Sequence, residues 1–228
     1  MRAIRSDAEH EWREVPRPEG DDTPPGEDIL LFESADGKFT AGLWRRPVRQ
    51  GAMTCPDHWV SIVIEGIAEV VDPDGTVHRA MSEDVLVTPR GSGGTWRCVT
   101  DVKKLWGICE TDEVAPGTFV VESGQPLIFN ETPGLALETA LPGGEAVVWR
   151  SGDGSFACGL RMGSLWEDRM APAHDEIAYL LEGDVEVESE REVLKVEPGD
   201  LLITPAGAEA VWRCLSTVRK FWVTYKGS

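Results

Sequence analysis

The stretch that decides the fold is HDEIAYLLEGDVEV (174–187), followed by EPGDLLITPAGAEAVWRC (197–214). Its short apolar runs are separated by Glu-Gly, Pro-Gly-Asp and Pro-Ala-Gly, which are sequences that favour turns. Runs of roughly four to eight residues have the length of β-strands rather than of helices. The same order of runs and turns occurs once earlier, over 57–98, so the sequence predicts two copies of one β-domain.

The match extends on both sides of this stretch. LFESADGKFTAGL (31–43) aligns without a gap with VWRSGDGSFACGL (148–160), and six of the thirteen positions are identical. Such a long spacing between copies indicates tandem domains rather than a solenoid. Identical pairs then continue in constant order: Glu65/Glu182, Gly66/Gly183, Asp84/Asp200, Thr88/Thr204, Pro89/Pro205, Trp96/Trp212, Cys98/Cys214, Lys104/Lys220 and Trp106/Trp222.

These matches predict the domain boundaries of an all-β chain with little helix. We expect a polar N-terminal arm at 1–28 and a first domain at 29–111. A linker that includes the second copy's leading strand, PLIFN, is expected at 112–143, and the second domain at 144–228.

The composition excludes several classes of partner. The 228 residues carry a formal charge of −18 and no basic tract, which argues against binding to nucleic acid or to an anionic membrane surface. No apolar run approaches the ~20 residues of a membrane-spanning helix, and the N-terminus lacks the apolar core of a signal peptide. We therefore expect a cytoplasmic protein. Its five cysteines contain no CxxC pair and are expected to be buried free thiols.

The turn and strand motifs of the second copy resemble those of the cupins. The resemblance rests on Glu176-x-x-Tyr179-x-Leu181-Glu182-Gly183, Pro198-Gly199-Asp200 and Pro205-x-Gly207. It implies two tandem jelly-roll barrels, also called double-stranded β-helices, and hence a bicupin. The closing pattern, Trp212 followed by Val218-Arg219-Lys220, is similar to a subgroup that includes the cupin domain of the ethanolamine-utilisation protein EutQ.

The ligands of a metal-binding cupin are not matched. Such a site has two histidines before the motif glutamate and a third after the Pro-x-Gly turn. Glu176 stands at the glutamate position, but Met170, Pro172 and Ala210 stand at the histidine positions. In the first copy Trp59 replaces the glutamate. We predict no metal site and no firmly bound cofactor, which leaves only a weakly bound divalent metal.

Candidate site residues follow from strand alternation. His174 and Glu176 are two residues apart and are predicted to face the second barrel's lumen as an acid–base pair or a partial metal site. The other reading of Glu176 is a carboxylate satisfied by neighbouring donors. Ligand-binding candidates are Arg161, Tyr179 and Trp212 in the second barrel and Trp44, Trp59 and His58 in the first.

Three functions are compatible with these residues. The first is a small-molecule-binding bicupin whose polar pocket lies in the C-terminal barrel and holds an organic acid, a sugar or an amine. The second is a hydrolase or isomerase that uses Glu176 as acid or base on a small metabolite. The third is a non-catalytic regulatory or assembly protein whose barrels pair within the chain or in a homodimer.

Overall fold

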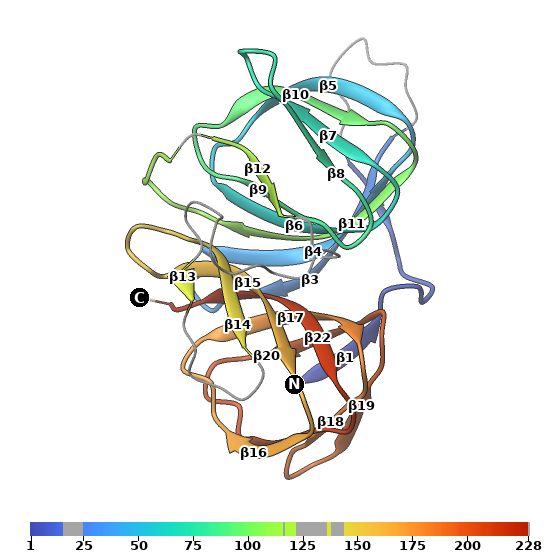
Figure 1. The fold of residues 1–228 in the computed structure, drawn as a ribbon, viewed down its shortest axis with the longest axis vertical. Coiled ribbons are helices and arrows are strands. Elements are labelled where there is room, and N and C mark those ends of the chain that lie inside the picture. The colour runs from blue at the N-terminus through green and yellow to red at the C-terminus, as the bar shows by residue number, and fades with distance from the viewer. Residues whose placement is uncertain (16–24, 116, 122–135, 138–143, 228) are drawn as a thin grey trace. The chain divides into compact units, whose positions relative to one another are not determined.

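The computed structural model describes residues 1–15, 25–115, 117–121, 136–137 and 144–227, and every helix or strand in these ranges is a β-strand (Figure 1). The prediction of an all-β chain is therefore confirmed, and the little helix that was expected is not found in these ranges. None of the described segments forms a helix of the length and apolarity that crossing a membrane requires. The chain divides into two compact units, Glu9–Pro126 and Met1–Ala8 with Leu127–Ser228.

The N-terminal unit is built from two antiparallel sheets. In the larger, the strand order is β12 (Phe119–Val121), β9 (Val85–Thr88), β6 (His58–Glu65), β11 (Val102–Cys109), β4 (Phe39–Arg46), β3 (Glu27–Glu33) and β2 (Arg13–Glu14). In the smaller, the order is β5 (Arg49–Thr54), β10 (Gly93–Cys98), β7 (Ala68–Val71) and β8 (Val77–Ala80).

The C-terminal unit repeats this arrangement. Its larger sheet has the order β1 (Arg2–Arg5), β20 (Asp200–Thr204), β17 (Asp175–Glu182), β22 (Val218–Tyr225), β15 (Phe156–Gly163), β14 (Glu145–Arg150) and β13 (Ala136–Leu137). Its smaller sheet has the order β16 (Trp166–Met170), β21 (Ala210–Cys214), β18 (Val185–Glu188) and β19 (Val193–Val196). Two tandem jelly-roll barrels result, as the repeat predicts.

The first residues of the chain complete the second barrel. Strand β1 pairs antiparallel with β20, and Met1 and Ala3 pack against the C-terminal core. In the N-terminal barrel the corresponding edge is covered by β12, which pairs with β9. Residues 1–28 were predicted to be an arm, and the structure places 2–5 in a sheet. PLIFN, at 126–130, lies outside the described residues.

Identical residues of the two copies build identical turns. Ser34 Oγ donates to Asp36 Oδ1 at 2.6 Å and accepts from the Phe39 amide at 3.0 Å. Ser151 Oγ donates to Asp153 at 2.6 Å and accepts from Phe156 at 3.1 Å in the same way. These side-chain bonds satisfy backbone groups that a turn leaves without a strand partner, which explains why Ser-x-Asp-Gly occurs twice.

Two pairs of equivalent glycines occupy positions where a larger residue would be strained or would clash. Gly66 and Gly183 have φ of 87° and 85°, a region that side chains disfavour. A Cβ on Gly42 would lie 2.7 Å from the Trp106 ring, and a Cβ on Gly159 would lie 2.4 Å from the Trp222 ring. The repeated glycine–tryptophan pairs are therefore packing devices of the barrel.

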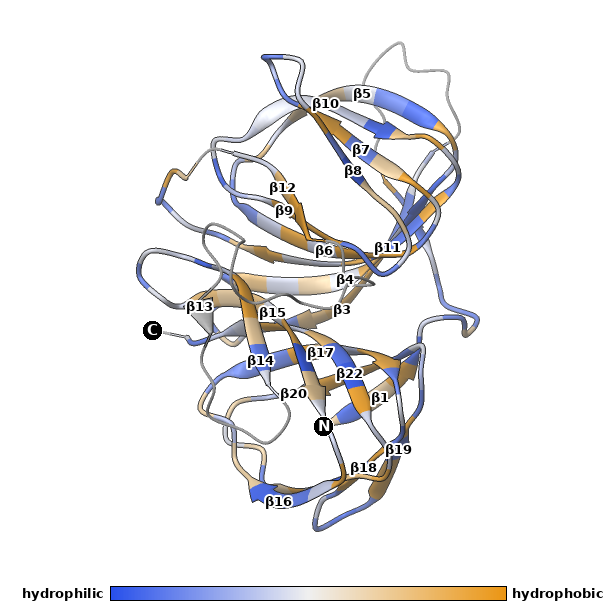
Figure 2. Cartoon of the chain, in the orientation of Figure 1, coloured by the Kyte–Doolittle hydropathy of each residue, from blue (hydrophilic) through white to orange (hydrophobic). Residues whose placement is uncertain are grey.

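Each barrel has an apolar interior made by both of its sheets. The C-terminal cluster joins Ala178 and Leu180 of β17 to Val187 of β18 and Trp212 of β21. The N-terminal cluster joins Val63 of β6 to other buried residues, with Trp44, Trp59 and Trp96 packed against it but only partly buried. In Figure 2 the strands β9 and β12 are mostly hydrophobic, whereas β16 is mostly hydrophilic.

Candidate functional site

Glu176 lies in the lumen of the C-terminal barrel, where it is paired with a lysine. Its Oε1 accepts a hydrogen bond from Lys220 Nζ at 2.5 Å, and the two side chains are only 17% and 13% exposed. Lys220 lies on β22, next to β17 in the sheet, and its ammonium is also 5.5 Å from the Trp212 ring. The pair explains how a buried carboxylate is tolerated here.

The pairing sets the ionisation of Glu176. Burial on its own would raise the pKa of this carboxyl, but the charge and hydrogen bond of Lys220 outweigh it. His174 and Arg161 add further attraction, and the pKa is lowered. A carboxylate held ionised is a poor proton donor near neutral pH, so the geometry favours the reading of Glu176 as a satisfied carboxylate over that of a general acid.

Two small cavities lie among the described residues of the C-terminal barrel. A cavity of about 30 Å³ lies beside Arg161, Trp166, Trp212 and Lys220, and a second of about 20 Å³ lies deeper. The Arg161 guanidinium carbon is 5.2 Å from the centre of the Trp166 ring. These volumes hold about one water each and no organic ligand, because ligand pockets are usually ~300 Å³ or larger.

Two predicted ligand-binding residues do not face a lumen. Tyr179 is three positions after Glu176 on β17, so its side chain is on the opposite face of the sheet. His58 precedes Trp59 on β6 and is likewise on the opposite face. Its ring is 1% exposed, and Nδ1 accepts a hydrogen bond from the Arg90 amide at 3.0 Å. We assign His58 to the barrel wall.

The donor set does not suit a metal ion. Among the residues that the structure describes, no group of three or more His, Cys, Asp or Glu side chains comes together. The Lys220 ammonium lies 2.5 Å from Glu176 Oε1 and takes the place that a metal cation would need beside this carboxylate. Most catalytic metal sites use three protein ligands, and the positions that would supply them hold Met170, Pro172 and Ala210.

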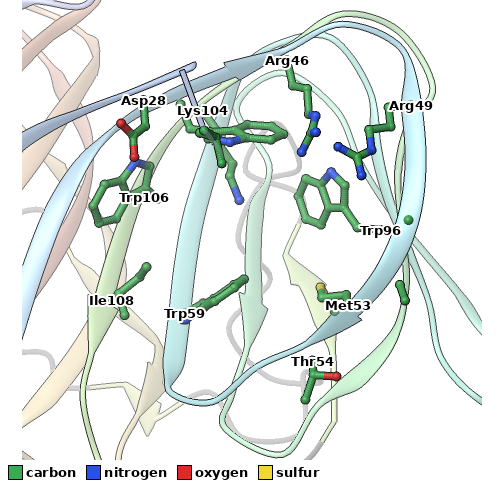
Figure 3. A pocket seen from close by; sticks show the side chains of 14 residues that line it. Asp28, Arg46, Arg49, Met53, Thr54, Trp59, Trp96, Lys104, Trp106 and Ile108 are labelled. Carbon is green, nitrogen blue, oxygen red and sulfur yellow. The ribbon is translucent and has the colours of Figure 1, made fainter. Parts of the chain in front are cut away.

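The large cavity is in the N-terminal barrel. It has a volume of about 430 Å³, which is in the range of sites for small organic ligands. Figure 3 shows Lys104, Arg46, Arg49 and Trp96 toward one end of the cavity and Trp59 toward the other. The other lining residues are Val15, Asp28, Trp44, Gly51, Ala52, Met53, Thr54, Trp106 and Ile108.

Lys104 lies among the indole rings of this cavity. Its ammonium is 4.3 Å from the centre of the Trp96 ring and 5.1 Å from that of Trp44. The two rings meet edge to face at 5.9 Å and 88°. Within the described part of the chain, no hydrogen bond or ion pair to Lys104 is formed, so its charge is balanced only by the faces of the rings.

Desolvation shifts the ionisation of this lysine. Burial among apolar groups lowers the pKa of Lys104 to about 8, against a weaker opposite effect of the Cys98 and Cys55 thiols. Burial also raises the pKa of both thiols, which therefore stay neutral near pH 8. The cavity thus holds an amine whose charged form has lost its water without gaining a carboxylate.

Arg46 adds a second buried donor group. It follows Trp44 by two positions on β4, and Trp44 is the register partner of Lys104 on β11. Arg46 and Lys104 are therefore diagonal neighbours on one face of the sheet, about 7–8 Å apart at their backbones. The Arg46 Nε and Nη2 atoms are buried and find no hydrogen-bond acceptor among the described residues.

Trp59 provides a third donor of the same kind. Its indole Nε1 is buried without a described acceptor. The one acidic side chain that lines the cavity, Asp28, is 3.2 Å from Arg13. Three cationic side chains and one carboxylate around a cavity make its interior positive, although the chain as a whole carries −18.

The structure brings together some predicted residues and adds others. Trp44 and Trp59 meet in the N-terminal cavity, and Arg161, Glu176 and Trp212 lie in the C-terminal lumen. Lys104, Arg46 and Arg49 were not predicted as site residues. Lys104 could have been found, because the repeat pairs it with Lys220 and pairs Trp59 with Glu176. The alignment shows a repeated lysine and an exchanged glutamate, and the structure shows that the two are partners in the second copy.

The comparisons agree with this architecture. The family model described as the EutQ-like cupin domain matches residues 150–222, which lie in the second copy. No curated protein matches the chain. Together with the solved structures, the family match confirms the predicted cupin resemblance and the tandem cupin fold.

Several solved structures share the fold over nearly the whole chain. A protein of unknown function from Pseudomonas syringae pv. tomato superposes with a TM-score of 0.70 at 15% identity, covering 96% of each chain. Ylba from E. coli has a TM-score of 0.68 at 13% identity, over 99% of this chain and 91% of that one. A salicylate 1,2-dioxygenase from Pseudaminobacter salicylatoxidans has a TM-score of 0.62 at 15% identity, over 87% of this chain and 76% of that one. At these identities the likeness concerns the fold.

Proposed function

We propose that this chain is a small-molecule-binding bicupin whose ligand pocket is the cavity of the N-terminal barrel. The observation that carries the proposal is the difference in free volume between equivalent barrels, about 430 Å³ against about 30 Å³. Only the larger volume accommodates an organic ligand. The sequence had favoured the C-terminal barrel, where the polar residues cluster.

The smaller cavity has a physical cause in side-chain exchange between the copies. Trp166 stands where the first copy has Arg49, and it lies against Arg161. Glu176 and Lys220 occupy further space as a contact pair. Trp212 is 5% exposed, whereas its equivalent Trp96 is only partly buried and lines the open cavity. These contacts support a structural role for the C-terminal barrel.

An enzymatic role for Glu176 has less support. Its salt bridge keeps the carboxylate ionised and engaged, and the neighbouring free space does not admit a substrate. A regulatory or assembly role is compatible with ligand binding, because a ligand-bound barrel can act as a sensor.

Tryptophan fluorescence tests the pocket location. Trp44, Trp59, Trp96 and Trp106 line the N-terminal cavity, so a bound ligand changes their emission. We expect hits from a panel of small organic acids, sugars and amines to be lost in Gly51→Trp, which adds an indole on the inward face of β5 beside the cavity. The hits should persist in Asp168→Trp at the equivalent position of β16. Hits that persist in the first variant and vanish in the second would place the pocket in the C-terminal barrel.

A further inference from the structure

We infer that the N-terminal cavity binds an organic carboxylate whose body is planar and unsaturated. The inference rests on the proposed pocket and adds the chemical class of its ligand. It is carried by the indole rings that line the cavity and by the buried donors of Arg46 and Trp59, which find no acceptor among the described residues.

The first argument is the need for a counter-ion. Lys104 and Arg46 place positive charge in a partly buried space, and within the described residues neither has an anionic partner. Buried charge without a partner is costly, and the cost is removed when an anion binds. The empty positive cavity is therefore complementary to a negatively charged group, and an amine or a neutral sugar does not supply one.

The second argument selects a carboxylate. The two Arg46 atoms that have no described acceptor are Nε and Nη2, which lie on the same side of the guanidinium. Their N–H bonds form the parallel fork that a planar carboxylate accepts with both oxygens. Lys104, a diagonal neighbour across the sheet, adds a point charge to the same region. With Arg49, the cavity has three cationic side chains against the one carboxylate of Asp28, so its charge is complementary to an anionic ligand.

The third argument selects the body of the ligand. Apart from its cations, the cavity is lined by indole rings and by Met53 and Ile108. Trp59 and Met53 lie across the cavity from the cationic end (Figure 3). Indole faces favour flat, polarisable groups, and thioethers adapt to aromatic edges. In a ligand that joins a ring or conjugated chain to a carboxylate, the carboxylate would contact the cationic end of the cavity and the planar body would contact Trp59 and Met53.

Benzoate and benzamide make a matched pair of probes, because they share a shape and differ in charge. We expect isothermal titration calorimetry to show benzoate binding at least tenfold more tightly than benzamide. Arg46→Gln and Lys104→Met should each lower the affinity for benzoate at least tenfold and leave the affinity for benzamide unchanged. Lys103→Met is the control, because Lys103 is adjacent on β11 but faces away and pairs with Glu65.

The outcomes separate this inference from the proposed pocket. If benzoate and benzamide bind equally and Gly51→Trp abolishes the binding of both, the pocket stands and the carboxylate class is wrong. If cyclohexanecarboxylate binds as tightly as benzoate, the carboxylate class stands and the inference of a planar ligand body is wrong. If Gly51→Trp affects the binding of neither benzoate nor any member of the wider panel, the proposed function itself fails. Circular dichroism of each variant confirms that lost binding is not lost folding.

Discussion

The two barrels of this chain contain the same lysine in two different electrostatic situations. Lys220 in the C-terminal barrel is held by Glu176 at 2.5 Å. Lys104 in the N-terminal barrel faces Trp59 at the equivalent position and has only the rings of Trp44 and Trp96 around its charge. The exchange of glutamate for tryptophan at this position removes the carboxylate partner of the lysine.

The comparison shows how a duplicated fold divides structure from binding. The shared residues, such as the Gly42–Trp106 and Gly159–Trp222 contacts, build both barrels alike. The exchanged residues decide what remains inside: Trp166 in place of Arg49 fills the C-terminal lumen, and Arg46 in place of Gly163 adds a donor to the N-terminal one. Function in this chain is therefore to be sought where the copies differ.

The largest expected effect is on stability, when each lysine is replaced. Lys220→Met leaves Glu176 buried without its partner, and we expect the free energy of unfolding to fall by about 2–3 kcal/mol at pH 7. Lys104→Met removes a charge that has no carboxylate partner, so stability should be unchanged or higher. Urea unfolding followed by tryptophan fluorescence measures both. Equal losses of unfolding free energy in the two variants would contradict the claim that only Lys220 has a carboxylate partner.

The next largest effect is on binding, when the exchanged position is restored. Trp59→Glu places a carboxylate opposite Lys104, as Glu176 is placed opposite Lys220. We expect the new ion pair to compete with the ligand and to weaken benzoate binding by about 100-fold, or about 2.7 kcal/mol. Trp59→Phe is the matched control and should retain most of the affinity. If calorimetry shows that Trp59→Glu binds benzoate with full affinity, the assignment of Lys104 as an anion-binding residue is wrong.

A third variant separates the barrels through the chain's first strand. Deleting residues 2–7 removes β1 from the edge of β20 together with the packing of Ala3. We expect the C-terminal unit to lose about 2 kcal/mol of stability, because four paired residues and their apolar contacts are lost. Benzoate binding should stay within twofold. A matched fall in benzoate affinity would show that the N-terminal cavity depends on this strand.

Much of the fold could be predicted from the sequence because turns are local. Ser34-x-Asp36 and Ser151-x-Asp153 bind their own backbone, so their recurrence revealed two copies before any contact was known. Strand alternation also identified Trp44, Trp59 and Glu176 as lumen residues. His58 and Tyr179 are at odd spacing from Trp59 and Glu176, so the same alternation places their side chains on the face away from the lumen.

The site was harder to predict because it is made of relations between distant strands. The polar residues Arg161, His174 and Glu176 favoured the C-terminal barrel, yet Lys220 neutralises Glu176 from another strand. Free volume cannot be read from one strand at all, since it depends on whether Trp166 or Arg49 projects inward. The β1–β20 pairing joins positions almost 200 residues apart and has no local signal.

The smallest effect is also the most direct test, because it follows the charge of Lys104 itself. Desolvation lowers the pKa of this lysine to about 8, so its positive charge is complete well below pH 8 and is lost as the pH rises through that value. Benzoate stays ionised throughout. The other ionisable groups around Lys104 are the neutral thiols Cys55 and Cys98, the guanidinium groups Arg46 and Arg49, and Asp28.

Benzoate affinity should therefore be measured by calorimetry from pH 6.5 to 9.5, for the unmodified chain and for Lys104→Met. We predict a constant affinity up to about pH 7.5 and then a fall of up to about tenfold per pH unit toward the affinity of Lys104→Met, because the protonated Lys104 strengthens anion binding. The weaker affinity of Lys104→Met should not change over the same range. A flat profile in the unmodified chain, or the same fall in both proteins, would contradict the assignment of Lys104 as the open cation of the N-terminal barrel.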